Sequence, residues 1–397
     1  MSNLDSIFAA DGPLARRIPQ FRQRESQREM ADRVAEAIAN AGVLIAEAGT
    51  GTGKTFAYLV PALLSGGKTI ISTGTKTLQD QLFHRDLPTV REALNIPVTT
   101  ALLKGRANYA CLHHMERAIH EGRFNSREES RHIHLIRRFA DRSLNGFGTG
   151  DKAELADVPE RSSAWTQATS TRENCLGSQC TQYADCFLMK ARKAAMDAEV
   201  VVVNHHLFFA DLVLKDGGAQ ELLPASNTVI FDEAHQLPET ATMFFGESVS
   251  SAQFLDLARD SRFAGIAHAP DFPAIGETAG VLEKAARDLR LVFLQANARL
   301  AGEAIRGAEG FNEAREACQD ALGELRESLE SQIDRHAEIA QCLARADELA
   351  ARLTLWNNAD ADLPADQTMI RWGEVFNQSV ALHVSPLSVA KPFRAEV

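Results

Sequence analysis

Two stretches far apart in the chain carry residue types that together can handle phosphate groups. The first, EAGTGTGKT, alternates glycine with other residues just before Lys54 and Thr55, so its backbone N–H groups can curl inward toward phosphate oxygens. In such a loop the lysine reaches the β- and γ-phosphates, and the threonine hydroxyl ligates Mg²⁺. The stretch therefore predicts an ATP site formed by Gly49, Thr50, Gly51, Thr52, Gly53, Lys54 and Thr55.

The second stretch, NTVIFDEAH, places Asp232 and Glu233 directly after an apolar, β-branched run. One carboxylate at a strand end can hold Mg²⁺, and the next can orient and deprotonate a water molecule that attacks a phosphate. Lys54, Asp232 and Glu233 are therefore the predicted catalytic residues, with Thr55 and Asp232 as Mg²⁺ ligands. The alternative for the acidic pair is an exposed position before a helix N-terminus.

Four cysteines form a third candidate site. Cys111, Cys175, Cys180 and Cys186 have the spacing C-x63-C-x4-C-x5-C. Four thiolates can close a tetrahedral zinc site or hold a 4Fe–4S cluster. Zinc sites usually contain tighter pairs, so the wider intervals favour the 4Fe–4S cluster, with zinc as the alternative. The remaining two cysteines, Cys318 and Cys342, lie in Ala-rich helical sequence and are expected in the core.

Composition sets the context for these sites. The 397 residues are 45% hydrophobic and 24% charged, which is ordinary for globular domains and excludes a fibrous or disordered chain. The first residues do not form a signal sequence, and there is no apolar run of about 20 residues that could span a membrane. We therefore expect a cytoplasmic protein without membrane contact, in which thiols stay reduced and bind metal. Although the net charge is −11, residues 101–193 contain 15 Lys and Arg against 11 Asp and Glu, a local excess that could suit nucleic acid.

The elements that must position the two phosphate motifs are short buried strands separated by helices. Strands are predicted at 43–46, 69–73, 97–103, 199–203 and 228–231. This alternation is typical of a parallel sheet covered on both faces, and we expect an α/β, RecA-like P-loop domain. The 178 positions from Lys54 to Asp232 exceed what one or two βα units need, so the cysteines are expected in a domain inserted between strands.

The sequence changes character after Pro238, where Ala, Glu, Arg and Leu dominate. Apolar residues then recur at helical spacing, at Leu322, Leu325, Leu329 and Ile333, and at Ile339, Leu343, Ala346, Ala350 and Leu353. The pattern favours long amphipathic helices in an intramolecular bundle over a self-associating coiled coil, because the seam is short and interrupted.

The motifs together resemble a known family. EAGTGTGKT and DEAH are similar to motifs of superfamily 2 helicases, and KGRANYAC, NCLGSQCTQYADCF and VVVVNHHLF resemble the iron–sulfur helicases of the XPD/DinG type, most closely the bacterial YoaA branch. The resemblance implies a RecA-like helicase domain 1 at 1–103 and 191–238, a 4Fe–4S cluster domain at 104–190, a helical arch domain at 239–363, and a return to helicase domain 1 at 364–397.

The resemblance also assigns roles to further residues. It implies that Arg24 and Gln27 recognise adenine, and that Thr73, Thr75 and Gln79 contact DNA phosphates. Capping of the following helix is the alternative role for the two threonine hydroxyls. Tyr109, Phe147 and Trp165 could stack on bases, with packing in the core as the favoured alternative for each.

The function implied by the resemblance is an ATP-dependent 5′–3′ DNA helicase of DNA repair or replication, a monomer with ATP, Mg²⁺ and a 4Fe–4S cluster as cofactors. Its expected partners are single-stranded DNA, forked duplex DNA, and replication or repair proteins. The chain has no SAT-like or QxxGRxxR motif, so we expect the amino-terminal part of a longer helicase that lacks the second RecA-like domain. The alternative is a nucleotide-gated iron–sulfur module that binds single-stranded DNA or senses redox state without unwinding. A nuclease is disfavoured, because no clustered carboxylates fit one.

Overall fold

The computed structural model describes residues 3–49, 51–122, 124, 126–216, 222–358, 369–387 and 389. The chain divides into two compact units, and each is described separately. The first unit comprises Met1–Ser170 and Ala184–Thr240, and the second comprises Thr171–Tyr183 and Ala241–Val397. None of the described helices is long and apolar enough to cross a membrane.

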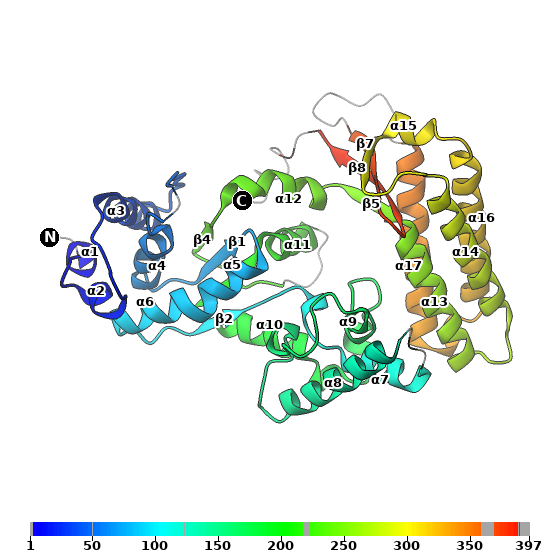
Figure 1. Cartoon of the computed structure of the whole chain (residues 1–397), viewed down its shortest axis with the longest axis horizontal. Coiled ribbons are helices and arrows are strands. Elements are labelled where there is room, and N and C mark those ends of the chain that lie inside the picture. Colours follow the sequence, from blue (N-terminus) through cyan, green and yellow to red (C-terminus); the bar gives the residue numbers. More distant parts are fainter. Residues whose placement is uncertain are drawn as a thin grey trace. The chain divides into compact units, whose positions relative to one another are not determined.

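A four-stranded parallel sheet in the order β2–β3–β1–β4 is the centre of the first unit (Figure 1). Its strands are β1 (Thr69–Thr73), β2 (Thr100–Leu102), β3 (Val200–Asn204) and β4 (Thr228–Phe231). Thr69 of β1 is in register with Val200 on one side and Thr228 on the other. Four of the five predicted strands and their parallel direction are therefore confirmed.

Helices pack around this sheet. They are α1 (Asn3–Ile7), α2 (Pro13–Arg17), α3 (Glu25–Ala39), α4 (Lys54–Leu64), α5 (Lys76–Gln81), α6 (Leu87–Leu94) and α11 (His205–Asp216). A further helix, α12 (Leu237–Phe244), begins in the first unit and ends in the second. A π-helical segment, Leu82–Asp86, joins α5 to α6. The core combines Ala31 of α3 and Leu59 of α4 with Ile71 of β1 and Val202 of β3, all fully buried. This apolar packing fixes α4, and with it the glycine loop, relative to the sheet.

The predicted strand at 43–46 is wrong. These residues lie outside any strand, and Val43 and Ile45 are 95% and 93% exposed. The apolar run was read as buried, but a strand is buried and hydrogen-bonded only where it has neighbours. The sheet ends at β4, and no described strand pairs with residues 43–46.

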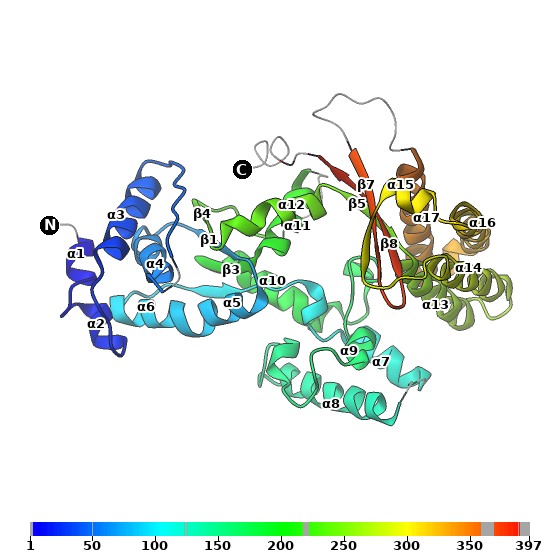
Figure 2. The ribbon, with the colours of Figure 1, turned by 45° about the horizontal axis from the view of Figure 1, so that its top comes forward.

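Between β2 and β3 the chain forms a small helical region with its own apolar core. Its helices are α7 (Leu112–Glu121), α8 (Arg127–Leu144), α9 (Ser163–Ala168) and α10 (Phe187–Asp197). Fully or almost fully buried side chains from each helix meet there, including Met115, Ile133, Trp165 and Phe187. The region folds around this cluster, next to the sheet of the first unit (Figure 2).

The second unit combines a helical bundle with an antiparallel sheet. Its elements are α13 (Ser251–His268), α14 (Ala274–Leu291), α15 (Gly302–Arg306), α16 (Phe311–Glu330), α17 (Ala337–Asn358), β5 (Glu247–Ser250), β6 (Ala298–Ala301), β7 (Met369–Val375) and β8 (Val380–Pro386). Leu322, Leu325, Leu329 and Leu353 are fully buried in one core, as the helical periodicity predicts. Cys318 and Cys342 are also buried there.

The expected return of 364–397 to the first domain differs from the structure. β7 and β8 instead form a hairpin that completes the sheet β5–β8–β7–β6 in the second unit. Alternate residues of β7, namely Gly373 and Val375, pair with Leu382 and Val380 of β8, so the apolar face of the hairpin packs on the bundle. Residues 359–368 and 390–397 lie outside the described part of the chain.

Candidate nucleotide-hydrolysis site

The glycine loop leads directly into α4, which begins at Lys54. Gly51 and Gly53 have φ angles of +74° and +86°, in the left-handed region that favours glycine. Thr52 Oγ1 donates a hydrogen bond to the Gly49 carbonyl at 2.9 Å and closes the turn. The loop therefore meets the backbone requirements of an anion-binding turn before a helix N-terminus. Thr50 lies outside the described residues.

Gln27 on α3 holds the end of this loop. Its side chain is buried, and Nε2 donates a hydrogen bond to the Gly53 carbonyl at 2.9 Å. A Cβ atom on Gly53 would lie 2.1 Å from the same Nε2 atom, so a larger residue there would displace the Gln27 side chain and also strain the backbone at φ +86°. Arg24, which precedes α3, is exposed. Adenine recognition by these two side chains stays a prediction.

The loop and the acidic pair lie together. Lys54 Nζ is 3.3 Å from Glu233 Oε1, across 179 positions of sequence. Asp232 follows β4, and its backbone N–H donates to the Ser72 carbonyl of β1 at 2.8 Å. The predicted catalytic residues Lys54, Asp232 and Glu233 therefore share one site, at the edge where parallel strands end.

The acidic pair is electrostatically strained. Burial, and then the neighbouring charge of Glu233, raise the pKa of Asp232 above its usual value. Glu233 itself has φ +57°, a left-handed conformation that costs energy for a residue with a Cβ. Two carboxylates on adjacent residues near a lysine form a donor set suited to Mg²⁺, since a cation would relieve their repulsion.

Two further residues of the site were missed by the sequence analysis. Tyr58 is buried and its hydroxyl donates to Asp232 Oδ2 at 3.3 Å. It lies four residues after Lys54, on the same helical face, and this spacing was the available signal. His205, fully buried at the start of α11, forms a 2.7 Å hydrogen bond through Nδ1 with the Ser72 hydroxyl, and burial lowers its pKa to about 4. It lies within the VVVVNHHLF stretch, and that resemblance was the available signal.

The three predicted DNA contacts have different surroundings. Gln79 is fully buried and its amide donates to the carbonyls of Leu103 and Val202, so its contact with DNA stays a prediction without support from these surroundings. Thr73 is also fully buried and donates to the Thr75 carbonyl. Thr75 is exposed, but its hydroxyl caps α5 by accepting from Leu78 N–H, as the alternative role predicts.

The three aromatic residues considered for base stacking also differ in burial. Tyr109 and Trp165 are buried in the core of the inserted helical region, whereas Phe147 is 74% exposed.

The four predicted cluster cysteines are divided between the two units: Cys111 and Cys186 are in the first, Cys175 and Cys180 in the second. All four are partly exposed, unlike the two core cysteines. Cys111 and Cys186 are the N-cap residues of α7 and α10. The donor set thus suits a thiolate-bound metal, and the sharing of one cluster by all four stays a prediction.

Comparison with known proteins is consistent with these motifs. Residues 27–119 match the DEAD/DEAH box helicase family model. The chain is 39% identical over its full length to the ATP-dependent DNA helicase YoaA of Haemophilus influenzae, and 50% identical over 284 residues, 72% of the chain, to YoaA of Escherichia coli. It spans 61% and 44% of the lengths of these relatives. The alignment with a solved structure described as truncated XPD covers 92% of this chain and 88% of that structure's chain. Its TM-score is 0.41, and the sequence identity is 14%.

Proposed function

We propose, from the match of residues 27–119 to the DEAD/DEAH box helicase model and the similarity to YoaA, that the chain belongs to this family and is the ATP-hydrolysing part of a DNA helicase. The observation that carries this proposal is the contact between Lys54 and Glu233, which joins the glycine loop to the acidic pair. For the longer protein we propose 5′–3′ unwinding of forked DNA in repair or replication.

Each residue of the site would have a separate role in ATP hydrolysis. The N–H groups of the loop and of the first turn of α4, together with Lys54, bind and orient the phosphates. Bound Mg²⁺ would neutralise charge on the β- and γ-phosphates, and Thr55 and Asp232 are the residues that would hold it. Tyr58 keeps the Asp232 carboxylate turned toward α4. Glu233 is left to orient a water molecule and accept its proton, once Lys54 moves from Glu233 to the phosphates.

We further propose that Cys111, Cys175, Cys180 and Cys186 hold a 4Fe–4S cluster. The support is the set of four thiolate donors, their partial exposure, and the two helix N-caps among them. Iron and sulfide analysis after anaerobic purification tests this proposal. Zinc without sulfide would contradict it.

Nucleotide binding tests the ATP site directly. We expect Lys54→Ala to lower the affinity for a fluorescent ATP analogue with Mg²⁺ by about tenfold or more, because charge-assisted contacts to the phosphates are lost. Lys284→Ala, at an exposed position of α14, is the matched control and should bind as wild type does. Equal affinity of the Lys54→Ala variant and the wild type would contradict the site.

DNA-stimulated ATP hydrolysis tests the helicase assignment. It is measured with and without single-stranded DNA, for this chain and for a longer form that spans the relatives' full length. Stimulation in the longer form, lost in its Lys54→Ala variant, is the expected result. A longer form that binds single-stranded DNA without stimulated hydrolysis would favour the binding module instead.

A further inference from the structure

Two lysines from separate parts of the first unit meet at one carboxylate oxygen. Lys76 is the first residue of α5, and Lys152 opens a 3₁₀ turn, Lys152–Glu154, in the inserted region. Lys76 Nζ lies 3.3 Å from Glu160 Oε1, and Lys152 Nζ lies 3.6 Å from the same atom. The Glu160 side chain is 63% exposed, so it can rotate away from the two lysines without disturbing the core.

The charges at this point do not balance. A hydrogen bond from Lys76 and then its charge lower the pKa of Glu160 below the usual value. Burial, followed by the charge of Lys76, lowers the pKa of Lys152. The two ammonium groups therefore repel each other, and a single carboxylate only partly offsets their charge. Both lysines contact the same oxygen of Glu160. A phosphodiester also carries a single negative charge, but it is shared between two non-bridging oxygens, so each oxygen could accept a hydrogen bond from one lysine.

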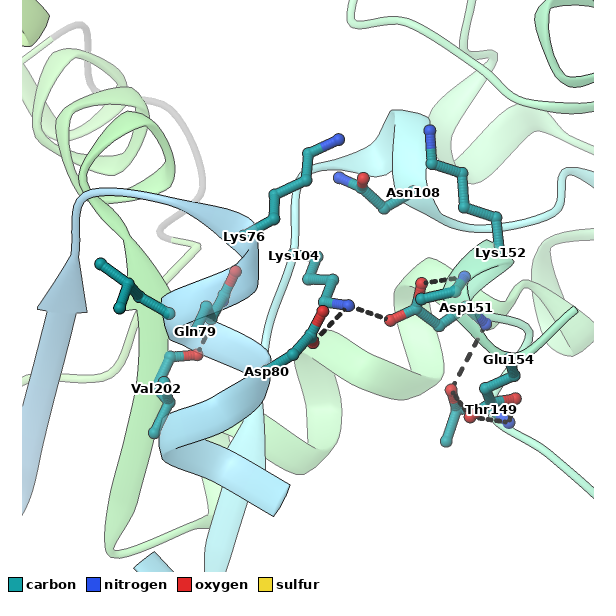
Figure 3. A network of polar contacts seen from close by, with 12 residues as sticks. Lys76, Gln79, Asp80, Lys104, Asn108, Thr149, Asp151, Lys152, Glu154 and Val202 are labelled. Atoms are coloured by element: carbon teal, nitrogen blue, oxygen red, sulfur yellow. Dashed lines mark hydrogen bonds and ion pairs between the residues drawn. The ribbon is translucent and has the colours of Figure 1, made fainter. Parts of the chain in front are cut away.

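A buried ion network sets the position of both lysines (Figure 3). Lys104, 3% exposed, places Nζ 2.6 Å from Asp80 Oδ1 and 2.6 Å from Asp151 Oδ2. Asp80 belongs to α5, the helix that Lys76 opens, and Asp151 directly precedes Lys152. In Figure 3 the side chains of Lys76 and Lys152 extend on the same side of this network. The two ammonium groups are thus held on one preformed framework.

We propose that Lys76 and Lys152 form a clamp for one backbone phosphate of single-stranded DNA, and that Glu160 occupies the clamp until the phosphate displaces it. The inference deepens the proposed function and rests on it, because it presumes that this unit binds DNA. Without DNA, the Glu160 carboxylate forms ion pairs with both lysines. When DNA is present, it competes with the phosphate for them. DNA affinity is therefore set below what the two lysines alone would give.

The test measures binding of a fluorescein-labelled oligothymidylate to the full chain by anisotropy, across a series of salt concentrations. Glu160→Gln should raise the affinity on the order of threefold to tenfold, because a competing charge is removed. Asp157→Asn is the matched control: it removes one exposed charge from the same loop, and no ion pair between Asp157 and either lysine is found among the described residues. It should change the affinity much less.

Lys152→Met should weaken binding and lower the slope of log affinity against log salt by about 0.7, the value for one phosphate contact on a single strand. Lys152→Arg should retain most of the affinity, which separates lost charge from lost folding. In the Lys152→Met background, Glu160→Gln should raise the affinity less than it does in the wild type, because the carboxylate then occupies only Lys76. Inorganic phosphate is included as a competitor, and displacement of DNA by low millimolar phosphate would assign the clamp to the free anion and overturn the proposal.

The clamp and the proposed function fail differently. If wild type binds the oligonucleotide but Glu160→Gln and Asp157→Asn behave alike, the clamp is overturned and the proposed function stands. If wild type binds no single-stranded DNA, the proposed DNA function fails, and the clamp with it.

Discussion

Replacing Lys104 by methionine tests the buried network that joins α5 to the inserted region. Lys104 lies just after β2, and its ammonium group pairs with two carboxylates, on Asp80 and Asp151. Burial alone would lower the pKa of Lys104, but the hydrogen bonds to Asp151 and Asp80 outweigh it, and the net pKa is raised. The stabilisation is therefore fully present at neutral pH and is lost only as the pH rises through the pKa of the folded lysine.

The loss of stability expected for Lys104→Met depends on how exposed the two carboxylates are. Methionine keeps most of the side-chain volume, so the loss is electrostatic rather than steric. It leaves two facing carboxylates without their cation, at side-chain exposures of 34% for Asp80 and 10% for Asp151. Breaking a fully buried pair costs about 3–5 kcal/mol, and water screens the more exposed Asp80, so we expect a loss of about 3 kcal/mol.

Urea unfolding followed by far-UV circular dichroism measures this loss at neutral pH. Lys190→Met is the control, since its 3.1 Å pair with Asp185 is exposed on both sides and should contribute less than about 1 kcal/mol. Adding Asp80→Asn and Asp151→Asn to Lys104→Met should recover much of the stability, because no unpaired charge remains. A loss from Lys104→Met no larger than that from Lys190→Met would refute the reasoning.

Two further predictions concern the glycine loop and the core thiols. Gly53→Ala should reduce nucleotide affinity by about tenfold or more, because the new Cβ meets Gln27 Nε2 and φ is +86°. The control is Gly122→Ala, at φ +62° with open space around it. It should lower the free energy of unfolding by about 1 kcal/mol and leave nucleotide affinity unchanged. A Gly53→Ala variant that binds normally would contradict this geometry. Burial raises the pKa of Cys318 to about 12 and that of Cys342 to about 11, so a thiol reagent at pH 8 should modify four cysteines in the folded, metal-free chain and all six after unfolding. Six reactive thiols in the folded chain would contradict the burial of these two.

The meeting of the glycine loop and the acidic pair was predictable because each motif is local and the geometry of a parallel sheet joins them. The glycine spacing before Lys54 predicts a turn, and the apolar run before Asp232 predicts a strand. Once both are in one α/β domain, the carboxyl ends of the strands bring them to the same edge. The long-range contact between Lys54 and Glu233 thus follows from two short patterns.

The sequence analysis failed where the outcome depends on burial. Burial is decided by residues that are distant in the sequence, and a local pattern does not identify them. The run 43–46 is apolar enough for a buried strand, but it has no described strand to pair with. Gln79 has a polar side chain suited to a phosphate contact, but the local pattern does not show that it lies on the buried face of α5, where its amide donates to the carbonyls of Leu103 and Val202. The apolar residues of β7 (Met369–Val375) and β8 (Val380–Pro386) indicate burial, but they do not show which sheet the two strands join.

The proposed ATP site and the proposed phosphate clamp are connected through one short segment of the first unit. At the end of β1, the carbonyl of Ser72 accepts from Asp232 N–H and its hydroxyl contacts His205. Four residues later Lys76 opens α5, capped by the Thr75 hydroxyl. Nucleotide and DNA phosphate would therefore bind at the two ends of the same five residues, 72–76. Because Lys104 anchors α5 to the inserted region, a shift of this segment must also move that region or strain the buried pairs. The structure thus offers a short route along the backbone from the acidic pair to the clamp.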